Sequence, residues 1–529
     1  MGYLLLWIES LAAALFLIAI VATGDFKSRL TKWLCAGFWL TVPIGLVGFE
    51  AFAAYIVSTS TFNWYVINTV SWLVCFIGAS AYILRIFTKN VQSHRQYFTG
   101  LFVSIALFVI TFWNMDSSVR LKLSSVRLEA SAMGLSAAPP RPLDDDNAAL
   151  VYEDAFKLLD GLNKDTEPAV HSKIIEHLGK PEFNTRNPEL QEFLKKRQSI
   201  IALLKRATAM RGCFFEHDYS KLSVDMSLPE LGNMRSCARL LAMDAQYKAA
   251  DGHIKEALED IRDIRTMARH VGSEPTLISG LVSVAIDSLA SETLETLLTT
   301  GELPTGDDLR SLSNPSMHSF QRTMNRCLSG EEALGLSVFG LMGSAEQMEL
   351  LQFTGMNSLA NEISLPFWRV YMLQDDLEAY RSLMEKLRKY SQEDFAQQKK
   401  DLDSLEKETK DRTVGRIMTS LLLPAVTRSI VSFTKADAKM RLANLALAMA
   451  AYHAKKNQFP DSLDQLVPDY ISNIPLDPFD DKNSLRYIAG KDSVTLYSVG
   501  PNQKDDSGKA SKTDDGDIVF HLGKTSEKP

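Results

Sequence analysis

The sequence NQFPDSL at residues 457–463, followed by PLDPF at 475–479, determines what the C-terminal part of this chain can form. Pro460 cannot continue a helix, so a helix predicted over 436–456 ends before it, and Asp461 is the predicted N-cap of a short second helix. Strands are predicted at 484–488, 493–498 and 517–521. The pattern indicates a small α+β domain with one long helix and an antiparallel sheet.

The order of these motifs, continued by YSVGPNQKDD at 497–506 and DDGDIVF at 514–520, resembles the globular domain of the type II secretion major pseudopilin, the protein G family. The resemblance covers about a fifth of the chain. It implies a calcium ion in the loop 498–517, held by carboxylates and backbone carbonyls. The matching side chains are Asp505, Asp506, Asp514, Asp515 and Asp517.

The residues of this loop also allow a second interpretation. Five Asp side chains would repel one another without a cation, and calcium prefers six to eight oxygen ligands. However, water and the nearby Lys504, Lys509 and Lys512 could screen the same charge on a solvated acidic turn. Calcium binding and a metal-free acidic turn therefore both remain open.

The chain also departs from the pseudopilin pattern. A pseudopilin begins with a short leader and an apolar helix through which it is processed and assembled. Here the corresponding apolar stretch, 414–433, is internal and interrupted by Arg416, Pro424 and Arg428. The resemblance therefore implies a pilin-type head joined to another protein, rather than a subunit that enters a pilus by the usual route.

Residues 117–412 show helical periodicity, with apolar side chains recurring every three or four positions. Asp146 or Asn147 is the predicted N-cap of a helix over 147–162. The hairpin 234–270 resembles a single tetratricopeptide repeat, but without a second copy a plain helical pair is the expectation, with helix 274–298 packed on it. A heptad-like seam is predicted to belong to an intrachain helix, with a coiled coil as the alternative; it consists of Leu373, Leu377, Tyr380, Met384 and Leu387.

Four apolar stretches fill the first 113 residues, at 3–23, 33–57, 64–84 and 98–113. Each approaches the roughly 20 residues that a membrane-spanning helix needs. Lys and Arg in the loops after the first and third stretches place those loops in the cytoplasm. We therefore predict a bacterial inner-membrane protein whose N-terminus and C-terminal region are both periplasmic.

Two carboxylates, Glu9 and Glu50, lie within the predicted spans at roughly 10 Å depth. They indicate either a shared proton or cation site, or carboxyls that reach a wet interface. Cys213, Cys237 and Cys327 allow at most one disulfide among them, and buried free thiols are the expectation. Cys213 also begins the run CFFEHD, for which we favour a structural loop over a metal site.

A net charge of −7 over 529 residues excludes a basic nucleic-acid binder. The familiar catalytic motifs are missing, since GLSVFG is one residue too long for G-x-S-x-G and GKT at 523–525 lacks the first glycine of a phosphate loop. We therefore expect a non-enzymatic envelope protein with a calcium-stabilised docking head, with the lipid bilayer and secretion-system or other envelope proteins as partners. The alternative is a small-ion or proton-linked transporter or membrane enzyme that uses Glu9 and Glu50.

The expected fold class is a membrane protein that is mainly α-helical. We divide it into a four-helix transmembrane domain at 1–114, a helical periplasmic domain at 115–335, a helical connector at 336–412 and the pseudopilin-like domain at 413–529.

Overall fold

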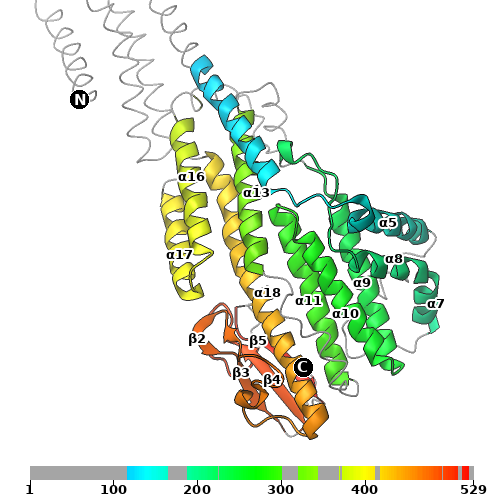
Figure 1. Ribbon diagram of the computed structural model, residues 1–529. Helices are drawn as coiled ribbons and strands as arrows, with labels where there is room; N and C mark the ends of the chain where they lie inside the picture. The colour runs from blue at the N-terminus through cyan, green and yellow to red at the C-terminus, as the bar shows by residue number, and fades with distance from the viewer. Residues whose placement is uncertain are drawn as a thin grey trace, which may run out of the picture. The chain divides into compact units, whose positions relative to one another are not determined.

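The computed structural model describes most of the chain beyond the predicted membrane spans (Figure 1). The described residues are 116–164, 188–223, 226–300, 320–342, 369, 372–411, 417–490, 492–509 and 515–523. The four predicted spans, with Glu9 and Glu50, lie outside them. Within the described ranges, one helical segment, Leu277–Thr299, is long and apolar enough to cross a membrane, and 61% of its apolar window is buried inside the protein. Such burial is typical of a core helix.

Most of the described residues are helical, as the sequence predicts. Besides helix 116–137, the longer helices are α5 (Ala148–Lys164), α7 (Pro188–Lys196), α8 (Gln198–Thr208), α9 (Pro229–Ala250), α10 (Ile254–Val271), α11 (Leu277–Thr300), α13 (Phe320–Leu341), α16 (Leu373–Tyr390), α17 (Phe395–Asp411) and α18 (Ile417–Lys456). Three short 3-10 helices are η1 (Asp144–Asp146), η2 (Tyr219–Lys221) and η3 (Leu463–Leu466).

The chain divides into two compact units, each assembled from segments that are distant in sequence. Unit 1 combines Met1–Glu129, Gly335–Leu383 and Leu405–Leu423. In its described part, Arg369 Nε donates to Asp116 at 2.6 Å, and the rings of Phe339 and Tyr380 pack with centroids 5.6 Å apart.

Unit 2 combines Ala130–Leu334, Met384–Ser404 and Pro424–Pro529. Its helical part contains the predicted hairpin, α9 and α10, joined by a turn in which Gly252 has φ +86°. Alanines such as Ala245, Ala257 and Ala268 are fully buried, which lets the helices approach closely. Helix α11 packs on both members of the pair, so the predicted three-helix arrangement is confirmed.

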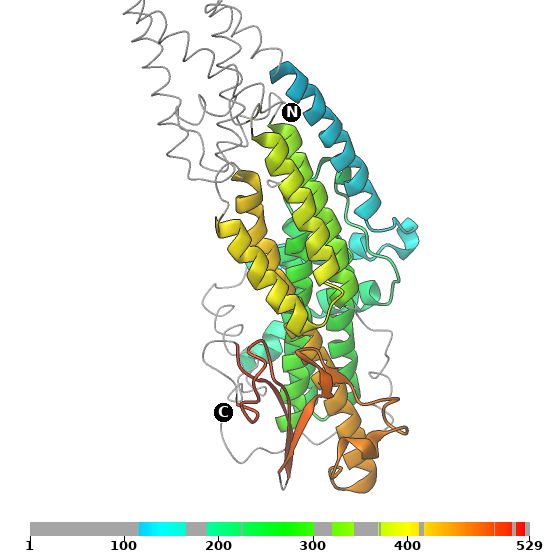
Figure 2. The same cartoon turned by 90° about the vertical axis from the view of Figure 1, so that its left-hand side faces the viewer.

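The C-terminal residues of unit 2 form the predicted small antiparallel sheet. A hairpin pairs β1 (Leu476–Asp477) with β2 (Asp480–Ser484), and a three-stranded sheet has the order β3 (Arg486–Ala489), β4 (Ser493–Ser498), β5 (Ile518–Gly523). In β4, Val494 and Leu496 are buried and lie opposite Leu522 and Phe520 of β5. These side chains share one core with the C-terminal half of α18, beside which the sheet lies in both views (Figures 1 and 2).

The long helix is longer than the sequence predicts. The helix predicted over 436–456 is confirmed as the second half of α18, which runs unbroken from Ile417 to Lys456 and takes in most of the apolar stretch at 414–433. Val426, Ile430 and Phe433 in its first half are buried in the protein. Their burial offsets the cost of a proline within the helix, which is about 3 kcal/mol.

Three further predictions concern local structure. Asn147, rather than Asp146, caps α5, since its side-chain oxygen accepts the N–H of Ala149 at 3.2 Å. Asp461 is not the cap of the short helix after Pro460; η3 begins at Leu463, and Ser462 occupies the preceding position. The heptad-like seam belongs to α16, where Tyr380 and the other seam side chains except the half-buried Leu377 are buried within the chain.

Candidate functional site

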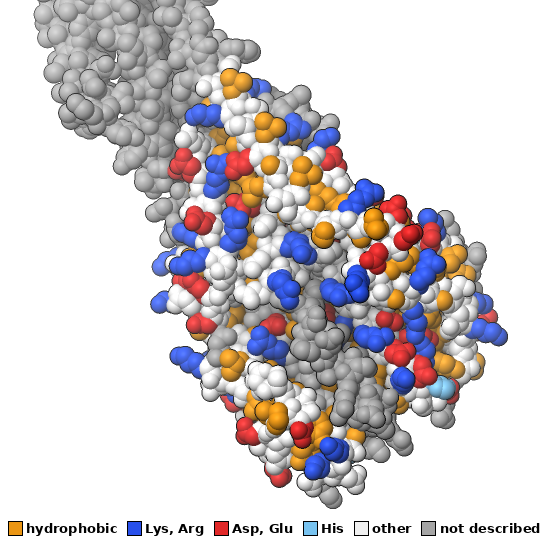
Figure 3. Space-filling view, in the orientation of Figure 1, with side chains coloured by type: hydrophobic (Ala, Val, Ile, Leu, Met, Phe, Trp, Pro, Cys, Tyr) orange, Lys and Arg blue, Asp and Glu red, His pale blue; other side chains and the backbone are white. Residues whose placement is uncertain are grey.

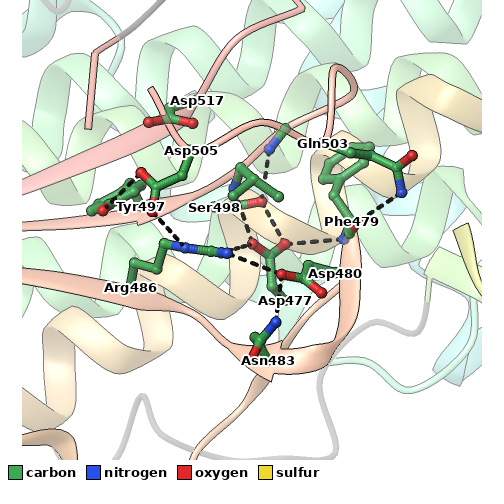
Figure 4. A network of polar contacts seen from close by, with 12 residues as sticks. Asp477, Phe479, Asp480, Asn483, Arg486, Tyr497, Ser498, Gln503, Asp505 and Asp517 are labelled. Carbon is green, nitrogen blue, oxygen red and sulfur yellow. Dashed lines mark hydrogen bonds and ion pairs between the residues drawn. The ribbon is translucent and has the colours of Figure 1, made fainter. Parts of the chain in front are cut away.

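The start of the acidic loop between β4 and β5 is held by a buried carboxylate, Asp477, at the end of β1 (Figure 4). Asp477 has no exposed surface and accepts four hydrogen bonds. The donors are the Ser498 hydroxyl at 2.6 Å, the N–H groups of Val499 at 2.9 Å and Phe479 at 3.0 Å, and Arg486 Nη1 at 3.3 Å. A buried charge is tolerated only when it is paired and hydrogen-bonded in this way. Asp477 therefore joins β1 to the start of the loop after β4.

Arg486, the first residue of β3, carries the positive charge of this network. Its guanidinium also donates to Asp480 at 2.9 Å and to Asp505 at 3.1 Å, so it bridges three carboxylates. Partial burial opposes ionisation of Arg486, but the hydrogen bond to Asp480 and the charge of Asp505 outweigh it and raise its pKa. A hydrogen bond from Asn483, and then the contact with Arg486, lower the pKa of Asp480.

Residues 505–508 of the loop lie over the outer face of the sheet. Gly508 lies against Ile488, Thr495 and Tyr497, where an added Cβ would come within 3.3 to 3.5 Å of their side chains. Its φ of +73° is one that glycine adopts without strain. The hydroxyl of Tyr497 donates to Asp505 at 3.2 Å, which ties the loop to the strand beneath it.

Asp517, at the end of the loop, organises its backbone. Its carboxylate accepts the N–H groups of Gly508 at 2.7 Å and Asp506 at 3.3 Å. Burial raises the pKa of Asp517, and the charge of Asp506 adds to the rise, while the two N–H groups oppose it. Asn502 completes the closure, since its N–H donates to the Asp515 carbonyl at 2.8 Å and its amide to Asp506 at 2.9 Å.

Helix α17, from a distant part of the sequence, contacts this loop and the neighbouring hairpin. Phe395 packs edge-on against Phe479 with ring centroids 4.5 Å apart. Lys399 donates to the Pro501 carbonyl at 2.8 Å, and the Gln503 amide donates to the Phe479 carbonyl at 3.1 Å. Helix α17 is thus joined to the loop although it lies about a hundred residues earlier in the sequence.

Three of the five predicted calcium ligands, Asp505, Asp506 and Asp517, accept hydrogen bonds from protein donors. Of the five, Asp514 lies outside the described residues; Asp505, Asp506 and Asp517 accept hydrogen bonds from Arg486, Asn502 and backbone N–H groups. Within the described ranges, no group of three or more His, Cys, Asp or Glu side chains is arranged to hold a metal ion. As they lie, the carboxylates of Asp505, Asp506 and Asp517 do not form a site lined by oxygen atoms alone, because N–H groups donate to them. Calcium binding stays a prediction.

The run that begins at Cys213 forms a second, buried polar cluster in unit 2. The Tyr219 hydroxyl donates to Glu274 at 2.5 Å, and His217 Nε2 lies 3.1 Å from a Glu230 oxygen. Burial raises the pKa of Glu274 to about 7 and that of the Cys213 thiol well above its usual range. Cys213, Cys237 and Cys327 are all buried and free, which confirms the expectation of free thiols.

Arg486, Asp477 and Ser498 are the functional-site residues that the sequence reasoning did not single out. Asp477 stands in the PLDPF motif. An Asp directly before a turn often accepts hydrogen bonds from the turn backbone, and this could have indicated its role. Arg486 is nine residues away from Asp477 and nineteen from Asp505, so their contact depends on hairpin geometry.

No family model, curated protein sequence or solved structure matches this chain. The function is therefore inferred from the network around Asp477 and Arg486 and from the packing of α18.

Proposed function

We propose that this chain is a non-enzymatic, membrane-anchored envelope protein that presents a pseudopilin-like head for docking to another envelope component, with secretion machinery as the expected class of partner. The anchor is the four predicted spans, and the head is residues 424–529 of unit 2. The head docks as a fixed part of the helical unit and does not enter a filament.

The packing of α18 carries this proposal. A pseudopilin uses its long apolar helix for assembly, whereas here that helix is covered by the chain's own helices. Phe433 of α18 lies against Gly280 of α11, where an added Cβ would come 2.7 Å from the Phe433 ring and 2.6 Å from Cys327 Sγ of α13. Ile430 and Phe433 are at most 2% exposed. Freeing this face for neighbouring subunits would break the core of unit 2.

The acidic loop supplies the surface that remains for docking. Hydrogen bonds to Asp477 and Asp517 hold the backbone of its described part, 499–509, while Lys504 and Lys509 are exposed and the Asp505 side chain is 48% exposed. A loop held in one conformation loses little entropy on binding, which favours recognition by a partner. We expect polar, charged contacts at this surface.

In-cell photo-cross-linking tests the proposal. A photoreactive residue replaces Lys504 in the loop of the full-length protein, or Lys157 on α5 as an exposed control, and mass spectrometry identifies the adducts in the membrane fraction. Secretion-platform or pseudopilin components cross-linked from position 504 and not from 157 support docking through the head. Adducts that are the same from both positions, or none from 504, contradict it.

A further inference from the structure

We propose that helix 116–137 pairs in parallel with the same helix of a second copy of this chain. The inference rests on the proposed membrane anchor and adds a self-association surface to it. Three leucines, each seven residues apart, point into solvent on this helix: Leu121 and Leu128 are 73% exposed and Leu135 is 59% exposed. Figure 3 shows hydrophobic side chains spaced along the helix.

The exposed face has the heptad pattern of a helix-pairing seam. Between the leucines stand the exposed small residues Ser118, Ser125 and Ala132, so the seam advances by three and four residues in alternation. This is the spacing by which two helices keep one face in contact, with leucine at one core position and a small residue at the other. The opposite face is already used, since Leu123, Val126 and Ala130 are buried in the chain.

The polar atoms on the seam can be buried without loss of hydrogen bonds. The hydroxyl of Ser125 donates to the Lys122 carbonyl at 2.6 Å, and that of Ser124 donates to the Leu121 carbonyl at 2.6 Å. An unsatisfied buried donor is costly, and these donors are satisfied within their own helix. Contact with a second helix at these two serines would therefore leave no donor unsatisfied.

The charges beside the seam also allow two identical helices to meet. In a parallel pair, the position after each leucine faces the position before each small residue of the partner. The first position holds Lys122, Glu129 and Ser136, and the second holds Ser117, Ser124 and Ser131. No like charges therefore face each other, and Glu129 is already paired with Arg381 of its own chain at 2.5 Å.

The proposed membrane anchor gives two copies of the chain the same orientation and raises their local concentration. The predicted span 98–113 lies just before this helix, so two copies inserted in one membrane present their seams in the same direction. Three leucines make a short seam, but tethering to one membrane makes pairing effectively intramolecular. A second copy is therefore the occupant that fits this face.

Cysteine cross-linking of the full-length protein in membranes tests the proposal. Leu121→Cys and Leu135→Cys are each oxidised, with Lys122→Cys as the exposed control one residue off the seam and the wild-type chain as background. A disulfide requires Cβ atoms within about 4.5 Å. We expect like-to-like dimers from both leucine positions, roughly tenfold above the Lys122→Cys control because of that geometric limit.

Further variants separate a parallel pair from the alternatives. With Ser125→Cys as reporter, the combined changes Leu121→Ala, Leu128→Ala and Leu135→Ala should abolish the dimer, and Lys122→Ala should leave it unchanged. Dimers formed only between co-expressed Leu121→Cys and Leu135→Cys chains indicate an antiparallel pair and overturn the proposal. So does a Leu121→Cys side chain that neither cross-links nor reacts with an impermeant maleimide, since lipid or another segment then covers it.

Fractionation of the same cells distinguishes the two proposals. Protein found in membranes without cross-linking at positions 121 and 135 overturns the pairing and leaves the anchor intact. Protein found in the soluble fraction overturns the anchor itself.

Discussion

Glu295 and His521 are joined by a hydrogen bond of 2.7 Å, in which the carboxylate of Glu295 in α11 accepts the backbone N–H of His521 in β5. Strand β5 is an edge of the three-stranded sheet, so this N–H has no strand to bind. The helical part of unit 2 thus satisfies the edge of the head through a side chain. An edge that is covered in this way is not available for pairing with another strand.

This contact predicts a pH dependence of stability. Burial raises the pKa of Glu295 to about 7, against the opposing effects of the His521 N–H and Lys439 and with a small addition from Glu292. The folded state therefore binds more protons than the unfolded state between about pH 4.5 and 7. The stabilisation from this group is fully present below that range and is lost, by up to about 3 kcal/mol, as the pH rises through 7.

Glu295→Gln keeps an acceptor for the His521 N–H and removes the titration. We expect the variant to be more stable than the wild type at pH 8 and similar to it at pH 5, by chemical denaturation. Glu274, whose pKa is also raised to about 7, contributes equally to both proteins. Glu292→Gln, at a side chain 58% exposed, is the control and should keep most of the wild-type slope, because Glu292 is the smallest contributor to the raised pKa of Glu295. An unchanged slope in Glu295→Gln would refute this role.

Removal of the bridging cation should destabilise the head. Arg486→Met leaves Asp477 buried with three of its four donors and leaves Asp480 and Asp505 without their shared partner. We expect the free energy of unfolding to fall by about 1–3 kcal/mol. Lys482→Met on the exposed β2 should change it by less than about 0.5 kcal/mol. Equal stability of the two variants, measured by urea denaturation, would show that the network contributes nothing.

Asp517 separates the two interpretations of the acidic loop. Because its carboxylate accepts two backbone N–H groups, Asp517→Ala should lower the melting temperature equally in calcium and in chelator. Asp515→Ala, at an exposed side chain, should have little effect in either. If calcium raises the melting temperature of the wild type and Asp515→Ala removes that rise, the loop binds calcium as the pseudopilin resemblance implies.

The packing of α18 predicts a contrast between two glycines. Gly280→Ala places a Cβ within 2.7 Å of Phe433 and Cys327 and should destabilise unit 2 by roughly 1–3 kcal/mol. Gly161→Ala on α5 meets nothing within 4 Å and should stabilise its helix by about 0.5–1 kcal/mol. Thermal melting of both variants checks this. A neutral Gly280→Ala would mean that α18 is loosely packed there.

The C-terminal end of the fold was predictable because its signals are local. Proline at 460 ends the long helix, and the alternation over 493–498 places β4 at the residues where the structure has it. The start of α18 was not predictable, because the sequence shows Pro424 and not the burial of Val426, Ile430 and Phe433 in the folded chain. Tertiary burial here overrides a local helix-breaking signal.

The site was predictable only in part. Its acidic residues were visible in the sequence, whereas the pairing of Asp477 with Arg486 depends on the register of two hairpins. The compact units are likewise discontinuous in sequence, so α17 and the head meet although their contacts, such as Lys399 with Pro501, are a hundred residues apart. Contacts of this kind leave no periodic pattern to read.

Hydrogen exchange of the full-length protein in detergent tests most directly whether the head and the helices of unit 2 form one structure. We predict that amides of β4, of α18 over 430–449 and of α10 exchange slowly and become labile together as denaturant is added. If β4 and the end of α18 instead open at a much lower denaturant concentration than α10, the head is an independent module on a tether, which contradicts the account.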